Sequence, residues 1–416
     1  MTTHINYDDI AREQVTSCGT ITEIQRFDAH GNLISHTDGA GYTTIKTYDA
    51  LNRLKTETTP SGDITTWSYA SDTVTCTPPS GEKSIQRYEA GALVESCTLA
   101  QDGTLVSQTC NTLHLEQSMT EETHGDVITT TWNNTKGLPV RIQQGNQTTT
   151  HIYDPAGNCI ATTDPEGYNT YRKFDELGRL EQKPLPDGAV ISYEYDADSN
   201  LIVCHMPGDL SWKATYDLMG CKTSEWLEAD SQISQQWKYS YINGQLSQSI
   251  DPMSRIHTYT YDDHSRLIEE SVDKEKRSYT YDERGLITSA KENNSTVERE
   301  YDASGRIIGE RIILNGKLIQ QTQQSWTPSS RTLQIGDHQR DFLYEAGRLK
   351  SLSSNGMNLS YEYNINGSLT KKTTPFSIVD LYYNNSGLPE VIHTQLLNHS
   401  YEETVHWTTS GKFASN

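Results

Sequence analysis

Aspartates that recur in phase are the residues of this chain best suited to acid–base or calcium chemistry. Nine of them directly follow an aromatic residue: Asp28, Asp49, Asp154, Asp175, Asp196, Asp217, Asp262, Asp282 and Asp302. A catalytic site needs one constellation of carboxylates, whereas these recur along the chain. A calcium-binding β-roll would show shorter Gly-Gly-x-Gly-x-Asp repeats. We therefore interpret the aspartates as turn residues whose carboxylates accept backbone N–H groups.

The other ionisable residues form no catalytic or metal-binding pattern. Adjacent glutamates, as at 121–122 and 269–270, would point to opposite faces of a strand. The histidines show neither HExxH spacing nor an accompanying serine nucleophile elbow; they include His114, His124, His205, His257, His264 and His338. Arginines in phase with the aspartates are expected to bridge turn carboxylates or backbone carbonyls; these are Arg53, Arg179, Arg266 and Arg306. We predict no catalytic, cofactor-binding or metal-binding residue, and no cofactor.

The cysteines predict neither a disulfide framework nor a zinc site. They are seven in number and contain no close CxxC pair: Cys18, Cys76, Cys97, Cys110, Cys159, Cys204 and Cys221. We interpret them as scattered small apolar residues in strands.

Composition favours sheets with a wet face over a deep globular core. Only 34% of the residues are hydrophobic, and 24 Tyr stand against 5 Phe. Tyrosine suits such a surface, because it can pack its ring and keep its hydroxyl hydrated.

The net charge of −21 argues against nucleic acid or an anionic membrane as a partner, because both need a basic patch. The N-terminus lacks the basic and apolar segments of a conventional signal peptide. No stretch approaches the roughly 20 apolar residues that span a bilayer. We expect no membrane insertion by this segment.

Aromatic residues form a ladder with a period of 20 to 21 residues, which points to a repeat architecture. Its members are Phe27, Tyr48, Tyr69, Tyr88, Trp132, Tyr153, Phe174, Tyr195, Tyr216, Tyr241, Tyr261, Tyr281, Tyr301, Tyr344, Tyr363 and Tyr383. The steps from Tyr88 to Trp132 and from Tyr301 to Tyr344 are 44 and 43 residues, close to two periods. A degenerate repeat is therefore expected in each gap, at about 89–125 and 309–340. These stretches are either eroded repeats or the places for specialised binding loops.

Two turn signals per period divide each repeat into two short strands. Four residues after the aromatic stands Gly, or Asn or Ser in its place, where a turn needs positive φ. Between turns, residues suited to the two faces of a half-buried strand alternate with a period of two, as in residues 190–195 and 258–261. One hairpin cannot bury its apolar face alone, so neighbours must pair edge to edge. The sequence predicts an all-β fold in which tandem hairpins form a continuous twisted sheet that curls into a spiral shell or barrel.

These residues resemble the YD repeats of the RHS family. The resemblance rests on in-register segments and on the lead-ins at 164–167 and 251–254, and it covers about residues 20 to 390. The segments are Tyr48-Asp49-Ala50-Leu51-Asn52-Arg53-Leu54, Phe174-Asp175-Glu176-Leu177-Gly178-Arg179-Leu180, Tyr261-Asp262-Asp263-His264-Ser265-Arg266-Leu267 and Tyr301-Asp302-Ala303-Ser304-Gly305-Arg306-Ile307. The family implies a spiralling sheet wound into a hollow shell, which in bacterial polymorphic toxins and in the B and C components of insecticidal toxin complexes holds a C-terminal toxin.

The chain departs from the full family pattern at its C-terminal end. The family's Asp-Pro-x-Gly-Leu motif, which ends the shell, is absent. The most similar sequences, at Asp164 and Asp251, are ordinary segments that precede a repeat inside the array. The self-cleaving aspartates and the toxin therefore cannot be carried over. We divide the chain into an N-terminal lead-in (1–20), the repeat array (21–390) and a C-terminal tail or truncated repeat (391–416).

The leading hypothesis is a non-enzymatic shell segment whose partner is a toxin polypeptide or another toxin-complex component. Such a protein would be made in the bacterial cytoplasm and exported by a specialised secretion system. The alternative is a module that binds carbohydrate or a cell surface through rows of Tyr and Trp. An enzyme would need a cleft built from the degenerate segments, and the sequence offers no nucleophile, metal set or phosphate loop for one.

Overall fold

The structure, a computed structural model, describes residues 3–407, which form forty β-strands and one short 3-10 turn at Leu115–Gln117. Each strand pairs antiparallel with the next one along the chain, as in β2 with β3 and β26 with β27, except that β17 and β18 do not pair. The strands are grouped in sheets of 17 and 23. The two sheets meet at Arg172, whose N–H donates to the carbonyl of Ile160 at 2.8 Å. The predicted all-β hairpin fold is therefore confirmed, with a division at Arg172.

The first sheet contains β1 (Thr3–Asp8), β2 (Glu13–Cys18), β3 (Ile21–Phe27), β4 (Leu33–Thr37), β5 (Thr43–Tyr48), β6 (Leu54–Thr58), β7 (Ile64–Tyr69), β8 (Thr73–Thr77), β9 (Lys83–Glu89), β10 (Ala92–Leu99), β11 (Leu105–His114), β12 (Met119–His124), β13 (Val127–Asn133), β14 (Pro139–Gln144), β15 (Gln147–Tyr153), β16 (Cys159–Thr163) and β17 (Asn169–Tyr171). The second contains β18 (Lys173–Phe174), β19 (Leu180–Pro184), β20 (Val190–Tyr195), β21 (Leu201–Met206), β22 (Leu210–Tyr216), β23 (Lys222–Ala229), β24 (Gln232–Ile242), β25 (Gln245–Ile250), β26 (Ile256–Tyr261), β27 (Leu267–Val272), β28 (Glu275–Tyr281), β29 (Ile287–Glu292), β30 (Ser295–Tyr301), β31 (Ile307–Leu314), β32 (Lys317–Trp326), β33 (Ser330–Ile335), β34 (His338–Glu345), β35 (Arg348–Ser354), β36 (Met357–Tyr363), β37 (Leu369–Thr373), β38 (Ser377–Tyr383), β39 (Pro389–Leu396) and β40 (Ser400–Thr404).

Two kinds of turn alternate along the chain and lie at opposite ends of the strands. We call those that follow the ladder aromatic YD turns, such as the turns between β3 and β4 and between β26 and β27. The others, such as those between β2 and β3 and between β4 and β5, we call back turns. In the YD turns Gly31 has φ +85° and Asn52 has φ +60°, as the Gly/Asn position predicts. A register shift beside the aromatic, as at Tyr48, marks a β-bulge where many YD turns begin.

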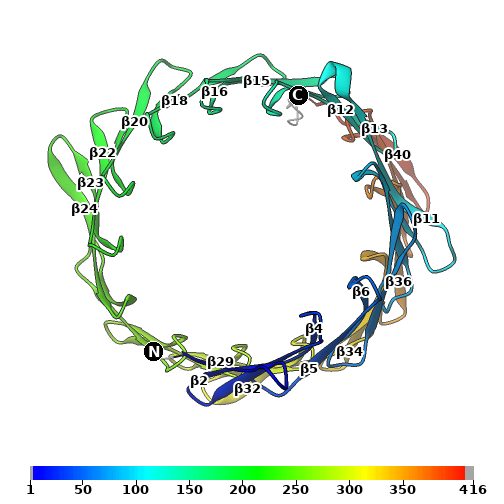
Figure 1. Ribbon diagram of the computed structural model, residues 1–416, viewed down its shortest axis with the longest axis horizontal. Helices are drawn as coiled ribbons and strands as arrows, with labels where there is room; N and C mark the ends of the chain where they lie inside the picture. Colours follow the sequence, from blue (N-terminus) through cyan, green and yellow to red (C-terminus); the bar gives the residue numbers. More distant parts are fainter. Residues whose placement is uncertain (1–2, 408–416) are drawn as a thin grey trace.

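The paired strands wind into a spiral that makes more than one turn (Figure 1). The N-terminal strands, blue in Figure 1, lie beside the yellow and orange strands of the C-terminal part, whereas the green part of the ring is a single layer. Contacts between the overlapping layers join residues about 242 to 246 positions apart, such as Cys18 with His264 and Gln144 with Ser386. One turn of the spiral therefore takes about that length of chain.

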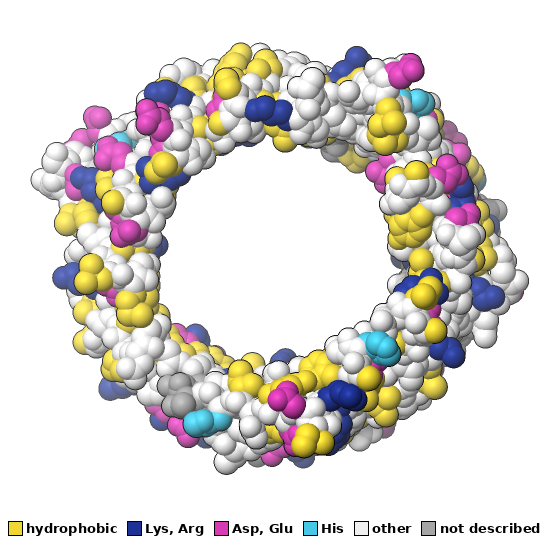
Figure 2. Space-filling model, in the orientation of Figure 1, with side chains coloured by type: hydrophobic (Ala, Val, Ile, Leu, Met, Phe, Trp, Pro, Cys, Tyr) yellow, Lys and Arg dark blue, Asp and Glu magenta, His cyan; other side chains and the backbone are white. Residues whose placement is uncertain are grey.

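The ring has no central core, and its middle is open (Figure 2). The apolar residues that are buried are small: Ala100, Ala161 and Ala214. Most side chains on the strands are half-buried against their neighbours. This explains how a chain with so few hydrophobic residues can fold, since the wall is one sheet thick and needs little apolar volume.

Strand pairing extends beyond the predicted array boundaries of 21 and 390. Strands β1 and β2 lie within the expected lead-in, and β40 lies within the expected tail, of which residues 408–416 are outside the described residues. The first turn resembles a YD turn, because Asp8 Oδ1 accepts from the amides of Ile10 and Ala11, both at 2.9 Å. The pair Tyr7-Asp8 stands 20 residues before Phe27-Asp28 and was the sequence signal for this repeat.

The two degenerate stretches also fold as hairpins. Residues 89–125 contain β10, β11 and β12, and residues 309–340 contain most of β31 together with β32 and β33. Strands β11 and β32 are longer than most, at 10 residues each. Within residues 3–407, no helix has the length and apolar character needed to cross a membrane.

Candidate functional site: the wall and the seam between its turns

Many YD turns are organised by the aspartate that follows the ladder aromatic. Asp302 Oδ1 accepts from the amides of Ser304 and Arg306, both at 2.9 Å, and Oδ2 accepts from Arg306 Nε at 2.7 Å. Partial burial alone would raise the pKa of Asp302, but the bonds from the Arg306 amide and guanidinium hold it below its usual value. The same bonds recur at the turns of Asp49, Asp175 and Asp262. The recurring carboxylates are thus occupied by their own turns.

The arginines connect one YD turn to the next. Arg179 pairs with Asp175, donates from Nη1 to the carbonyl of Asp196 at 3.2 Å, and lies 4.6 Å from the centre of the Tyr195 ring. Arg266 makes the equivalent contacts with Asp262, with the carbonyl of Asp282 and with the Tyr281 ring. Each such arginine therefore ties the carboxylate of its own repeat to the backbone and aromatic ring of the following repeat.

The tyrosine hydroxyls make a second link between repeats, which sequence reasoning missed. Tyr195 Oη donates to the carbonyl of Leu180 at 3.0 Å, and Tyr69 Oη donates to that of Leu54 at 2.8 Å. The same bond is made by Tyr48, Tyr153, Tyr216, Tyr241, Tyr261, Tyr281, Tyr301, Tyr363 and Tyr383. The expectation of a hydrated hydroxyl was wrong. The excess of Tyr over Phe was the available signal, because only Tyr carries this donor.

Removing one of these hydroxyls is expected to destabilise the wall locally. Tyr195→Phe leaves the Leu180 carbonyl without its partner and should lower the free energy of unfolding by about 1 kcal/mol. Urea denaturation followed by tryptophan fluorescence would measure the change. Tyr168→Phe, at a back-turn residue that is 66% exposed, is the control and should have no effect. Equal stability of the two variants would contradict the assignment.

Asp251 is the most buried carboxylate of the wall, with a side chain that is 2% exposed. Burial alone would raise its pKa. Hydrogen bonds from the Arg255 amide, from Arg255 Nε at 2.7 Å and from His257 Nε2 at 3.4 Å instead lower the pKa to about 2. The arrangement belongs to a back turn, because Asp251 Oδ1 also accepts from the amide of Met253. It makes Asp251 a structural carboxylate.

The ionised Asp251 should contribute a stability that is lost in acid. Since the pKa falls from about 3.9 in the unfolded chain to about 2 in the folded chain, the contribution is full above about pH 4 and disappears as the pH drops through 2. We expect Asp251→Asn to melt at a lower temperature than the wild type at pH 6, and this difference to close between pH 4 and pH 2. Thermal melts by circular dichroism would check it. A difference independent of pH would refute the prediction.

The seam between the two layers of the spiral is built from turns, not from paired strands. YD turns of the second layer lie against back turns of the first. His264 Nε2 lies 2.6 Å from the carbonyl of Cys18, and Ser304 Oγ donates to Ser61 Oγ at 2.9 Å. Arg284 lies 4.8 Å from the centre of the Tyr42 ring. Side chains at the tips of the YD turns thus hold one layer on the other.

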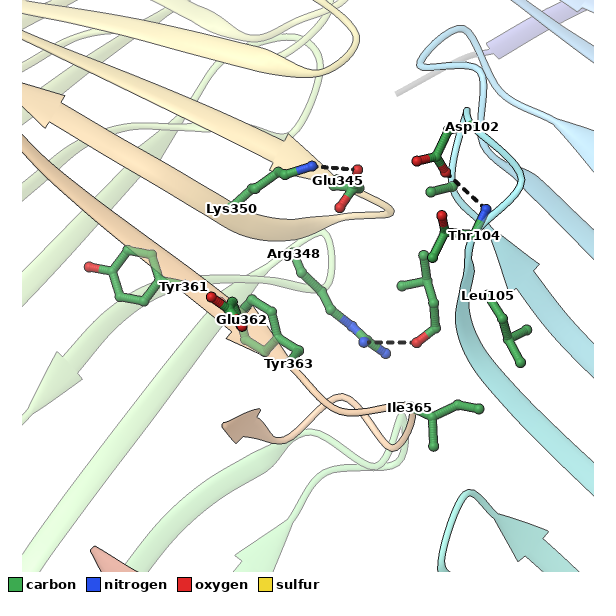
Figure 3. Close-up of a pocket in the computed structure, with 12 residues that line it drawn as sticks. Asp102, Thr104, Leu105, Glu345, Arg348, Lys350, Tyr361, Glu362, Tyr363 and Ile365 are labelled. Atoms are coloured by element: carbon green, nitrogen blue, oxygen red, sulfur yellow. Dashed lines mark hydrogen bonds and ion pairs between the residues drawn. The ribbon is translucent and has the colours of Figure 1, made fainter. Parts of the chain in front are cut away.

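A cavity of about 340 Å³ lies in the same seam, where residues 100–106 face residues 345–365 (Figure 3). Arg348 reaches across it and donates from Nη1 to the carbonyls of Val106 and Asn364, both at 3.3 Å. Lys350 is paired with Glu345 at 2.8 Å. Charged side chains that line the cavity are thus used in contacts across the seam, as for Arg348, or in ion pairs, as for Lys350 with Glu345. We therefore interpret the cavity as part of the seam.

Another polar cluster lies on β22 to β24, in the single-layered part of the wall. Tyr239 Oη donates to Glu225 Oε1 at 2.5 Å, and Glu225 also accepts from Lys222 and Trp212. Burial and the neighbouring Glu225 raise the pKa of Tyr239. Each carboxylate oxygen of Glu225 is thus used within the wall. Among residues 3–407, no group of three or more His, Cys, Asp or Glu is placed to hold a metal ion, and all seven cysteines are free thiols.

The repeat and the fold both have counterparts among known proteins. The sequence model of the RHS Repeat family matches residues 27–64. A protein of Burkholderia cenocepacia (strain H111) named double-stranded DNA deaminase toxin A is 25% identical over 162 residues, which cover 39% of this chain and 11% of that protein.

Three solved structures share the architecture over 98% of this chain, each with 11% sequence identity. They are TcdB2-TccC3 (TM-score 0.70, 26% of that chain), TcdB2-TccC3-TEV (0.72, 26%) and the Tc holotoxin pore of Photorhabdus luminescens (0.67, 27%). The chain therefore spans about a quarter of the length of these structures and about a tenth of the Burkholderia protein. The likeness to the solved structures shows the fold.

Proposed function

Because this chain is built of RHS/YD repeats, we propose that it is a non-enzymatic wall segment of a toxin shell, which encapsulates or helps deliver a toxic polypeptide. The observation that carries the proposal is the open ring (Figure 2), whose wall is held together by its own Asp, Arg and Tyr side chains. Those side chains are the ones that could otherwise act on a substrate, and they are used between repeats.

The partner in this proposal is a toxin polypeptide or another component of a toxin complex. The names of the similar proteins, a deaminase toxin and Tc toxin components, support this choice. The protein would be made in the bacterial cytoplasm and exported by a specialised secretion system. A glycan-binding role gains no support from the wall, because rings such as Tyr69, Tyr195 and Tyr281 lie under arginines of the preceding repeat.

Co-expression with the product of the adjacent open reading frame tests the proposal. The two chains should purify together, and trypsin should cleave the bound product at least tenfold more slowly than the free product. The variant Gly39→Leu, which is expected to loosen the contact between the two layers, is a matched comparison. It should protect the bound product from trypsin less well than the wild type does. Failure to form a complex, or equal cleavage with and without the wall, would reject an encapsulating role.

A further inference from the structure

The tip of a YD turn, two residues after its Asp or Asn, is the position that contacts the neighbouring layer. At this position the backbone N–H often donates to the turn carboxylate or amide, as in Leu51 with Asp49 and His264 with Asp262, so the side chain points away from its own turn. At the seam the tip residues are polar: His264, Arg284, Ser304, Asn366 and Ser386. Ser386, for example, exchanges hydrogen bonds with Gln144 of the first layer at 3.2 and 3.3 Å.

The YD turns of the first layer, from the turn after β1 to the turn after β24, form a rim that faces away from the seam. We call it the YD rim. Four of its tips are large and apolar: Ile10 is 96% exposed, Leu51 and Leu177 are each 71% exposed, and Met219 is 78% exposed. Leu218 beside Met219 is fully exposed. The remaining tips include His30, Lys136, Ala156 and Asp198. Apolar side chains thus occupy the position that makes interlayer contacts elsewhere in the same chain.

The back turns from 163–169 to 396–400 form the opposite rim, which we call the back rim. It also exposes large apolar side chains: Tyr168 at 66%, Met253 at 77%, Phe376 at 63% and Leu397 at 78%. Back turns are the partners that YD turns meet in the seam. The two rims are therefore of complementary type, since the contact between them already exists once within the chain.

We propose that the YD rim of one copy of this chain stacks coaxially on the back rim of a second copy and so continues the spiral contact. The apolar tips are distributed around the ring, from Leu51 in the first hairpins to Met219 on its far side, so a compact ligand cannot cover them together. A second ring of the same diameter can. The position that these apolar side chains occupy is the one that makes the interlayer contact within the chain. A contact between unlike rims is head-to-tail, so stacking can extend beyond two copies.

Charge opposes this stacking and makes it depend on salt. Both rims carry many aspartates, for example Asp175, Asp196 and Asp217 on the YD rim and Asp187, Asp209 and Asp230 on the back rim, and the chain has a net charge of −21. Screening shortens the range of this repulsion from about 10 Å at 0.1 M salt to about 4 Å at 0.5 M. Association should therefore strengthen as salt rises, because the apolar contacts remain while the repulsion fades.

Sedimentation velocity of the chain alone, at about 1 to 100 µM and at 0.1 and 0.5 M NaCl, tests the proposal. The wild type should shift from monomer toward dimer and larger species, and more so at high salt. The triple variant Leu51→Asp, Leu177→Asp, Met219→Asp should weaken association at least 100-fold. Its matched control is Ile45→Asp, Ile64→Asp, Ile152→Asp, which places the same charges on strand residues that are 50 to 59% exposed and should associate like the wild type.

A mixing experiment tests the head-to-tail geometry. A back-rim variant, Tyr168→Asp, Met253→Asp, Phe376→Asp, should be monomeric alone, as should the YD-rim variant. Mixed, they should form a dimer that grows no further, because each retains one intact rim. A wild type that stays monomeric at 100 µM in 0.5 M NaCl, a single-rim variant that still associates alone, or a mixture that stays monomeric would each overturn the proposal. The measurement uses no cargo, so its outcome is independent of the encapsulation test.

Discussion

Gly39→Leu is expected to force the two layers of the spiral apart at one point of the seam. A Cβ atom at Gly39 would clash with Ile21 Cγ2 and would lie 2.8 Å from the backbone carbonyl oxygen of Glu283 in the second layer. The backbone at Gly39 does not have positive φ, so the effect comes from the lack of space. The backbone of Glu283 cannot rotate away as a flexible side chain would. Overpacking of this kind costs about 1–3 kcal/mol.

Hydrogen exchange reports this change where it occurs. The amides of the YD turn 282–286 should exchange about tenfold faster or more in Gly39→Leu than in the wild type, since tenfold corresponds to about 1.4 kcal/mol of local stability. The control is Pro165→Leu, because Pro165 occupies the equivalent place in a back turn of the back rim, which has no second layer against it. It should leave exchange at 282–286 unchanged. Unchanged exchange in the glycine variant would show that the layers do not touch there.

Asp302→Ala should have the second large effect, and Asp302→Asn should be tolerated far better. Alanine removes the acceptors of two backbone N–H groups and of Arg306 Nε, and we expect a loss of about 2 kcal/mol in unfolding free energy. Asparagine keeps the Oδ1 acceptor. Asn134, Asn364 and Asn384 already serve in this way, each accepting the amide four residues later at 2.9 to 3.0 Å.

Urea denaturation of the two Asp302 variants separates the roles of the carboxylate. If its task is to satisfy the turn backbone, Asn should retain most of the wild-type midpoint and lose only the charged contact with Arg306. If the ion pair with Arg306 dominates, Asn and Ala will be equally destabilised, and the turn-centred account will be wrong. Exchange of the Ser304 and Arg306 amides would identify the affected bonds directly.

The local structure of this chain was predictable because its signals are periodic. Aspartate or asparagine followed by Gly, Asn or Ser fixes most YD turns, and the alternation between turns fixes the strands, so the hairpins followed from the sequence. The first repeat was missed because Ala11 stands four residues after Tyr7 in place of Gly, and the positive φ, +51°, falls one residue later, on Arg12. The degenerate stretches kept their hairpins because strand pairing depends on the backbone. In the second stretch Trp326 takes the place of a ladder tyrosine and donates from Nε1 to the carbonyl of Ile307 at 2.9 Å.

The seam could not be predicted from residue types. Its contacts use His264, Arg284 and Ser304, which share only their polarity and their place at the turn tip, and exposed tips elsewhere are polar too. Which turns meet depends on the diameter of the ring, and that diameter is the sum of small twists and bends over some 240 residues. The tyrosine links were hidden for a different reason: the hydroxyl donates to a main-chain carbonyl, which every residue possesses.

The spacing of the seam has a consequence for biosynthesis. Hairpins and the arginine and tyrosine links join residues fewer than 20 positions apart, so they can form as soon as each repeat leaves the ribosome. His264 meets Cys18 only after a further 246 residues have been made. Throughout that interval the growing chain is an unclosed ribbon with an accessible concave side. Whatever is to lie within the ring can therefore enter sideways during synthesis, before the later layer settles on the earlier one.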